Sequence, residues 1–303
     1  MKRFIIFFVI IAIFFNGFAQ NVPQYNLYNH NLFLLSPAAI GLNGGVNVYA
    51  GHKTQWTGLN DAPQYSYFTA NGLLTKSMGV GMSFNMQKYG IFNVMNIGVG
   101  YAYRIGFSRY QALSLGVSVN FVQNSINTEN LYAEEMVDPA LISNNFNQSL
   151  FYTGFGIEYR YKDFGVDLSV PVLYGVQENK FFQTSFLYAQ YNFRLSDNIW
   201  KLKPSVLLRY SRGSRVQADI NVLVDWNDVA WFQSSYRTNN EILFGAGVFI
   251  KHLGIGYSYE LVTKPISYAS GGSHEIVVLF DFPIFVNKKR PLYYDGRRRN
   301  SWN

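Results

Sequence analysis

The chain has 303 residues and a formal net charge of +7. Apolar residues make up 49% of it, aromatic residues 18% and charged residues only 14%, and there are 26 Gly and no Cys. So many aromatic residues exclude a disordered chain, and the high share of Tyr, Phe and Gly disfavours a helical bundle. The lack of Cys excludes disulfides, thiolate metal sites and a lipid-anchoring thiol. A β-protein with an unusual amount of apolar surface fits this composition.

Residues 1–19 have the order of a secretory signal peptide. Two basic residues precede an apolar run at 4–15, and the small residues at 17–19 offer a cleavage site. The alternative is a membrane anchor, but the apolar run is shorter than the roughly 20 residues that a bilayer core requires. We therefore expect a mature chain that begins at Gln20 and crosses an inner membrane.

The positive charge is concentrated at the two ends of the chain. Lys2 and Arg3 leave with the signal peptide, and the segment after Phe282 carries a net charge of +5, so the rest of the mature chain is neutral. Nucleic-acid-binding proteins usually carry their positive charge on a folded face. We therefore predict no nucleic-acid partner.

Alternating residues predict β-strands with one apolar face. Between Ile97 and Gly106, for example, large apolar residues alternate with Gly, Ala and Arg. The same pattern recurs along the chain and predicts fourteen strands, at residues 45–52, 63–72, 78–87, 94–106, 110–123, 151–162, 164–171, 184–195, 201–210, 217–226, 229–238, 242–251, 253–262 and 273–282.

Three features favour a membrane barrel over a soluble sandwich. The strands have the length of tilted membrane strands, about 9–11 residues. Their polar face is rich in Gly and Ser and poor in charge. Short connections alternate with longer ones at 53–62, 124–150, 172–183 and 263–272, as periplasmic turns alternate with outer loops. The predicted fold is an all-β, transmembrane antiparallel β-barrel of the outer membrane over residues 45–282, in contact with outer-membrane lipid and with both termini in the periplasm.

The polar face also suggests a filled lumen. It carries charges of both signs, whereas a selective pore favours rings of one sign; the residues are Arg104, Arg160, Arg194, Lys203, Arg209, Arg237, Glu158, Asp167, Asp219, Asp225, Glu260 and Glu275. We expect them to form ion pairs across the interior. Paired glycines on this face, such as 154/156, let the wall curve or let another segment pack closely. Residues 20–44 are the candidate segment, placed either in the periplasm or inside the lumen.

No motif for catalysis or for cofactor binding is present. His274-Glu275 begins a metalloprotease-like HExxH sequence, but Val278 stands where the second His is needed. Barrel lipases and proteases assemble their sites from scattered residues, so spacing alone leaves that alternative open. We predict a non-enzymatic protein with no cofactor and no metal site.

Several stretches in order resemble the PorP/SprF family of outer-membrane proteins of the type IX secretion and gliding machinery. These stretches are Asn31 to Gly41 (with Ser36 where the family more often has Asn), Gln55-Trp56-Thr57-Gly58 followed by Ala62-Pro63, Tyr101-Ala102-Tyr103, Tyr236-Arg237, Gly256 to Tyr259, and Gly272 to Ile276. The resemblance covers nearly all of the mature chain up to Phe282. The basic tail 283–303 departs from it, because family members usually end close to the last strand.

The resemblance implies a binding role. Family members partner a secreted, adhesin-like protein through its C-terminal sorting domain, or a periplasmic lipoprotein that binds peptidoglycan. Trp56 has the character of an interface anchor or, alternatively, of an aromatic belt residue at the lipid boundary. Candidate partner-binding residues are Gln55, Trp56, Gly58, Pro63, Arg237, His274 and Glu275, with Arg297, Arg298 and Arg299 in the tail. The rival class is a diffusion channel or a transporter of hydrophobic substrates.

Overall fold

The computed structural model describes residues 24–126, 148–176, 180–195, 199–263 and 269–282. The predicted signal peptide, most of the predicted loop 124–150 and the basic tail with Arg297, Arg298 and Arg299 lie outside the described residues. The described part of the chain contains no helix with the length and apolarity that a membrane span requires.

Fifteen strands and three short 3-10 helices make up the described structure. The helices are η1 (Tyr28–His30), η2 (Leu32–Leu34) and η3 (Pro37–Ala39). The strands are β1 (Val46–Thr54), β2 (Gln64–Leu73), β3 (Met78–Tyr89), β4 (Phe92–Ser108), β5 (Gln111–Ile126), β6 (Gln148–Tyr161), β7 (Phe164–Gly175), β8 (Lys180–Tyr191), β9 (Phe193–Leu195), β10 (Trp200–Ser211), β11 (Gln217–Trp226), β12 (Ala230–Arg237), β13 (Glu241–Ile250), β14 (Leu253–Val262) and β15 (Ser273–Phe282).

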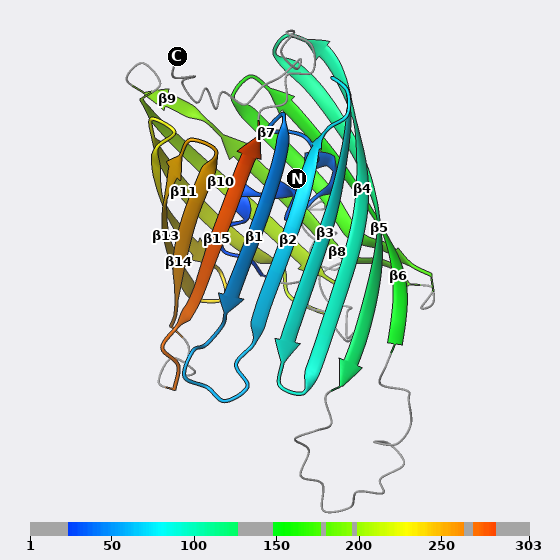
Figure 1. Cartoon of the computed structure of the whole chain (residues 1–303), viewed down its shortest axis with the longest axis vertical. Coiled ribbons are helices and arrows are strands. Elements are labelled where there is room, and N and C mark those ends of the chain that lie inside the picture. The colour runs from blue at the N-terminus through cyan, green and yellow to red at the C-terminus, as the bar shows by residue number, and fades with distance from the viewer. Residues whose placement is uncertain (1–23, 127–147, 177–179, 196–198, 264–268, 283–303) are drawn as a thin grey trace, which may run out of the picture.

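The strands close into one antiparallel barrel (Figure 1). β1 pairs with both β2 and β15, and the pairing of β10 with β11 completes the ring. β9 continues β8 after a one-residue interruption at Asn192, and β10 pairs with both of them. The barrel therefore has fourteen strands, which confirms the predicted fold class. Closure leaves no strand edge, so the backbone groups of the strands find partners within the sheet, apart from local register shifts such as those between β6, β7 and β8.

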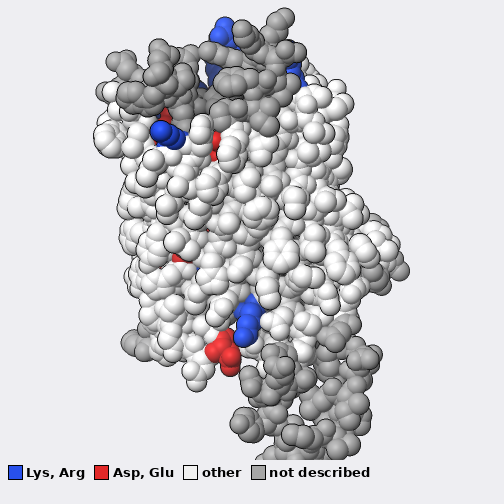
Figure 2. All heavy atoms as spheres, viewed as in Figure 1, with Lys and Arg blue, Asp and Glu red and all other residues white. Residues whose placement is uncertain are grey.

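The apolar face of the strands points outward and the polar face points into the lumen. On β4 and β5, Val99, Val117 and Val119 are at least half exposed, whereas their neighbours Ala102, Arg104 and Ser114 are buried. The middle of the wall seen in Figure 2 is almost free of charged side chains. Because successive side chains of a strand point to opposite faces, the alternating sequence places apolar residues toward lipid and polar residues toward the lumen.

The two ends of the barrel differ in their connections. We call the end where β1 meets β2 and β14 meets β15 the loop end, at the bottom of Figure 1, and the opposite end the turn end. The turn-end connections are short, as at 109–110 and 251–252. The loop-end connections are not uniformly longer: β3 and β4 extend toward each other and leave only residues 90–91 between them. The ladder there continues to the pair Tyr89 and Phe92, which lengthens the wall in place of a loop.

Residues 24–44, which we call the lumen segment, run through the inside of the barrel. Gln24 donates a hydrogen bond to Gln217, the first residue of β11 at the loop end (2.7 Å). At the other end of the segment, Leu73 N donates to Gly45 O, where β1 begins at the turn end. The sequence Ser36-Pro37 starts η3, since Ser36 Oγ accepts from Ala38 N (3.2 Å) and proline suits the first helical position.

The hydrophobic core of the molecule lies between the lumen segment and the wall. One cluster joins Tyr25 and Leu27 of the segment to Tyr67, Leu223, Trp231 and Val277 of the strands. A second joins Tyr28 and Leu35 to Phe186, Tyr188 and Leu207. The segment therefore supplies the apolar contacts that the polar inner face of the barrel cannot provide by itself.

Glycines in the wall make room for the segment. A Cβ at Gly116 would overlap the backbone of Pro37 and Ala38, and a Cβ at Gly156 would overlap Ser36 Oγ. Gly79, Gly81 and Gly100 likewise face Ile40 or Phe33. Others do not serve the segment: at Gly247 on β13 and Gly256 on β14 the space is taken by the Trp231 side chain of β12. Close packing of another segment is therefore confirmed for some of the glycines, whereas a role in curving the wall stays a prediction.

The close approach of Ser36 to Gly156 gives a direct test of where the segment lies. Because the chain has no Cys, the double variant Ser36→Cys with Gly156→Cys carries one possible disulfide. We expect it to form on export, and to be seen as a reducible mobility shift on gels of the unfolded protein. Ser36→Cys with Gly165→Cys is the matched control, since Gly165 contacts Gln190 and Arg160 instead. Equal cross-linking of both pairs would contradict the placement.

Candidate functional site

A cluster of buried charges lies at the loop end of the lumen. We call it the ion cluster; its members are Lys53, Arg209, Asp219, Arg237, Glu241, Glu260 and Glu275, and all are at most 7% exposed. Arg237 pairs with Asp219 (3.1 Å), Glu241 (2.7 Å) and Glu260 (3.3 Å). Glu260 also pairs with Lys53 (2.8 Å), and Asp219 with Arg209 (2.8 Å). Four of the predicted lumen charges, Arg209, Asp219, Arg237 and Glu260, therefore form interior ion pairs within this cluster. Arg194 does not, because it pairs with Asp163 at an exposed site.

Asn26 of the lumen segment is held by groups on several strands of the wall. Its backbone N–H donates to Glu275 Oε2 (2.6 Å), and its carbonyl accepts from Gln233 Nε2 (3.0 Å). Its side-chain oxygen accepts from Lys53 Nζ (3.0 Å), and its amide nitrogen donates to Ser258 Oγ (3.3 Å). Every polar group of this fully buried residue is thus bonded, which offsets the cost of removing it from water.

The charged groups of the cluster bond to uncharged hydrogen-bonding groups as well as to one another. Lys53 Nζ uses all three of its protons, on Glu260, Asn26 and the carbonyl of Gln24 (2.9 Å). Glu275 also accepts a hydrogen bond from Tyr67 OH (3.0 Å), whose ring packs against the lumen segment. The cluster and the segment therefore form one hydrogen-bonded unit, in which Lys53 and Glu275 depend on the segment for part of their bonding.

A buried phenol of the segment extends this unit toward β3. Burial, reinforced by the nearby Glu275 carboxylate, raises the pKa of Tyr25 well above its usual value. The phenol is therefore protonated and donates to Asn85 Oδ1 (3.0 Å), while its ring packs on Tyr67 with centroids 4.5 Å apart.

Two connections at the loop end are hydrogen-bonded to each other. Thr57 N donates to Gly272 O (2.8 Å) and Gly271 N donates to Thr57 O (2.7 Å). Trp56 N adds a bond to Ser273 Oγ (3.3 Å). Gly58 and Gly272 have φ of +96° and +89°, which favours glycine at both turns. We call this surface, made by residues 55–58 and 269–273, the paired loops; their bonds fix it as one rigid feature.

The candidate residues Gln55 and Pro63 close the first of these loops. Gln55 N donates to Pro63 O (2.8 Å), and Gln55 Oε1 accepts from Tyr65 OH (3.2 Å). His274 lies next to the loops on the outer face, where its Nδ1 is 2.6 Å from Tyr257 OH. The residues Gln55, Trp56, Gly58, Pro63 and His274 thus gather at one end of the barrel.

Arg237 and Glu275 lie elsewhere, inside the lumen. Each is only 1% exposed, and both belong to the ion cluster that holds Asn26. The structure assigns them a stabilising role there, and direct contact with a partner stays a prediction for them. Sequence patterns missed Asn26, Lys53 and Glu241: the first belongs to no periodic element, and the other two lie just beyond the predicted ends of their strands.

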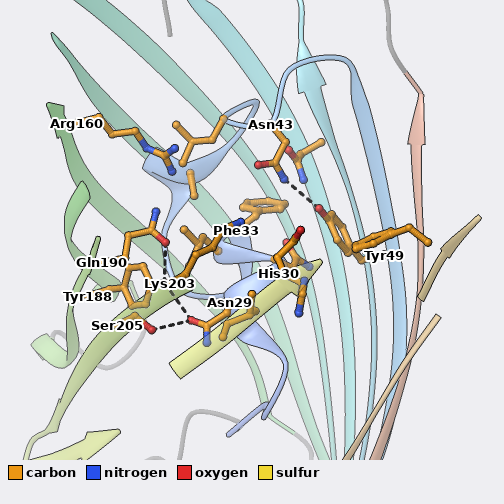
Figure 3. Close-up of a pocket in the computed structure, with 18 residues that line it drawn as sticks. Asn29, His30, Phe33, Asn43, Tyr49, Arg160, Tyr188, Gln190, Lys203 and Ser205 are labelled. Carbon is orange, nitrogen blue, oxygen red and sulfur yellow. Dashed lines mark hydrogen bonds between the residues drawn. The ribbon is translucent and has the colours of Figure 1, made fainter. Parts of the chain in front are cut away.

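On the turn-end side, side chains of the lumen segment such as Asn29 point toward side chains of the wall such as Tyr188 (Figure 3). A pocket of about 40 Å³ lies there, enough for a few water molecules. Tyr188 OH lies 3.0 Å from both Asn29 Oδ1 and Gln190 Oε1, which share its single proton, and Asn43 donates to Tyr49 OH (3.1 Å). The segment therefore interrupts the lumen with side chains bonded across the gap.

A larger cavity of about 450 Å³ opens beside the segment at the loop end. Its walls are the loop-end parts of β3–β8, and its floor is the stretch 33–37 of the lumen segment. Within the described residues, no group of three or more His, Asp or Glu comes together as metal ligands would.

The sequence matches, over residues 17–280, the profile of a family described as type IX secretion system membrane protein PorP/SprF. The chain belongs to the PorP/SprF family. The resemblance seen in the motifs is thereby confirmed, and the protein is an outer-membrane β-barrel of the type IX secretion system family. A search of curated protein sequences gave no match.

The solved structure of an outer membrane protein supports the fold. The outer membrane protein Omp33 of Acinetobacter baumannii is similar with a TM-score of 0.52 at 9% identity, and the match covers 80% of this chain and 100% of Omp33. The toluene transporter TodX of P. putida has a TM-score of 0.48 at 9% identity, over 82% of this chain and 92% of TodX. At these identities the likeness to Omp33 concerns the architecture of the barrel alone.

Removal of the central cation of the ion cluster tests its importance for stability. In Arg237→Met, three buried carboxylates lose a partner. We expect the free energy of unfolding to fall by about 3–5 kcal/mol, the usual cost of breaking a buried pair. Urea unfolding in lipid vesicles measures this change.

Arg194→Met is the matched control, because Arg194 pairs with Asp163 (2.7 Å) at a site where its side chain is 43% exposed. That variant should lose no more than about 1 kcal/mol. Equal losses in the two variants would show that the ion cluster contributes nothing beyond an ordinary surface pair.

Proposed function

We propose that this protein is a non-enzymatic anchoring barrel of the type IX secretion and gliding machinery. It binds a secreted, adhesin-like protein through the partner's C-terminal sorting domain, a periplasmic peptidoglycan-binding lipoprotein, or both. The observation that carries the proposal is the filled lumen: the chain's own residues 24–44 occupy the interior and are held by the ion cluster. Such a barrel is suited to presenting a rigid surface on each side of the membrane.

The paired loops are the proposed contact for the secreted partner. The hydrogen bonds of Thr57 with Gly271 and Gly272 fix this surface before binding, which reduces the entropy lost on association. Trp56 is a partly buried aromatic side chain within it, of the kind that dominates interface energies. In this proposal the loop end faces the cell surface, and both termini and the basic tail face the periplasm.

Trp56→Ala tests the surface contact in the native membrane. After mild detergent extraction of the tagged protein, we expect mass spectrometry to recover at least about thirtyfold less of the secreted partner, as for an interface hot spot. Recovery of the periplasmic lipoprotein should not change. Trp226→Ala is the control, since Trp226 is exposed on the turn-end part of the wall.

The result also separates the two roles that Trp56 can have. If Trp56 is an aromatic belt residue at the lipid boundary, both variants recover the secreted partner equally, and the contact proposed for the paired loops is wrong.

Deletion of residues 283–303 tests the contact on the periplasmic side. The proposal expects loss of the lipoprotein, and unchanged recovery of the lipoprotein would contradict docking by the tail.

Single-channel recording distinguishes the anchoring barrel from the rival diffusion channel. The wild-type protein in planar bilayers should show no large steady conductance, because the lumen segment interrupts the path and the turn-end pocket admits only a few waters. Arg237→Met should show frequent transient openings, since it weakens the attachment of Asn26. A large, steady conductance of the wild type would favour the channel.

A further inference from the structure

We propose that the loop-end cavity is a binding site for a short, neutral oligosaccharide. The site is distinct from the paired loops, and it goes beyond the anchoring role. Its volume of about 450 Å³ falls within the range of small-molecule sites. Tyr89 at the end of β3 and Ile126 at the end of β5 mark its mouth, so it opens at the loop end.

The described walls of the cavity disfavour charged ligands. None of the described residues that line the cavity is charged; the polar ones are Ser, Thr, Asn, Gln and Tyr. An ion bound there would lose its water without gaining a partner of opposite charge, which is costly. The opposite half of the loop-end lumen has the reverse character, since it contains the ion cluster and is filled by residues 24–28.

Amide and hydroxyl side chains match a ligand rich in hydroxyl groups. Each Asn or Gln offers two donors and an acceptor, and each Ser offers both functions, as does every sugar hydroxyl. They project in rows from neighbouring strands, because alternate residues of β3, β4 and β5 point into the lumen. These rows are Ser83, Asn85 and Gln87 on β3, Asn96 on β4, and Ser118, Asn120 and Asn124 on β5.

The mouth of the cavity carries a platform of aromatic rings. Tyr89 and Phe92 face each other across the ladder, with centroids 5.7 Å apart and planes inclined by 27°. They are 40% and 45% exposed, although their side chains line the cavity and do not face lipid. An apolar ring face beside hydrogen-bonding groups suits the mixed faces of a pyranose.

A peptide segment fits the cavity less well. Extended peptides are usually bound by adding a strand to an open sheet edge, and this closed barrel has no such edge. The backbone of a bound peptide would therefore depend on side chains alone, whereas the hydroxyls of a saccharide meet their usual partners there.

The test is saturation-transfer NMR on the full-length protein in an amine-oxide detergent, whose head group contains no sugar. The probes are neutral trisaccharides of glucose, mannose, galactose and N-acetylglucosamine, a trisaccharide of uronic acids, and an uncharged Asn- and Ser-rich peptide. We expect saturable binding of at least one neutral trisaccharide and none of the charged one. Absence of saturable neutral binding, or stronger binding of the peptide, would overturn the proposal.

Three variants locate the binding. Val122→Trp fills the cavity, and Asn120→Leu removes hydrogen bonds at nearly constant size; each should weaken binding at least about tenfold. Asn43→Leu is the matched control, because Asn43 lines the turn-end pocket. Heat-modifiable migration on gels shows that each barrel is folded. Unchanged affinity in both cavity variants, or an equal loss in Asn43→Leu, would place the sugar elsewhere and overturn the assignment.

Discussion

The rest of the lumen depends on how Asn26 is held by the ion cluster. Its four polar groups bond to Glu275, Gln233, Lys53 and Ser258, so that β1 and the C-terminal strands β12, β14 and β15 hold one residue together. This attachment fixes the start of the lumen segment against β1 and β11–β15, and the apolar side chains that follow pack against the wall from that fixed point. Buried charges are expensive in isolation, so the bonds from Lys53 and Glu275 to the segment stabilise both the cluster and the segment.

The attachment divides the loop-end lumen into two unlike halves. One half contains seven charged side chains and the beginning of the lumen segment. The other half is lined by uncharged amides, hydroxyls and aromatic rings, and it is hollow. The segment forms the boundary, since its stretch 33–37 is the floor of the cavity. The lumen segment therefore both interrupts the lumen and forms one boundary of the cavity at the loop end.

The extended strands and the paired loops determine the shape of the surface at the loop end. β4 and β5 continue to Phe92 and Ile126, which raises the wall around the cavity where a longer loop was expected. Across the barrel, Thr57 bonds to Gly271 and Gly272, so the connections there lie together. The cavity and the rigid loop surface thus belong to the same end of the molecule but to different strands.

Fourteen strands could be predicted because period-two alternation is a local property of the chain. The apolar character of Val117 and the polar character of Ser118 indicate which face of the sheet each residue occupies, whichever strand pairs with theirs. The exact ends of the strands could not be predicted, because the alternation of apolar and polar residues stops where the strands extend beyond the lipid. Lys53 and Glu241 were placed outside their strands for this reason, although both face the lumen in the ion cluster.

The sequence by itself determined the barrel, its lipid-facing side and the mixture of charges inside it. Only the tertiary structure decided which charges meet, because Arg237 and Glu260 become neighbours through closure of the sheet rather than through spacing in the chain. It also decided the position of the lumen segment, which has no periodic pattern, and the role of Asn26. That role depends on several strands converging at one point, which no local pattern of residues encodes.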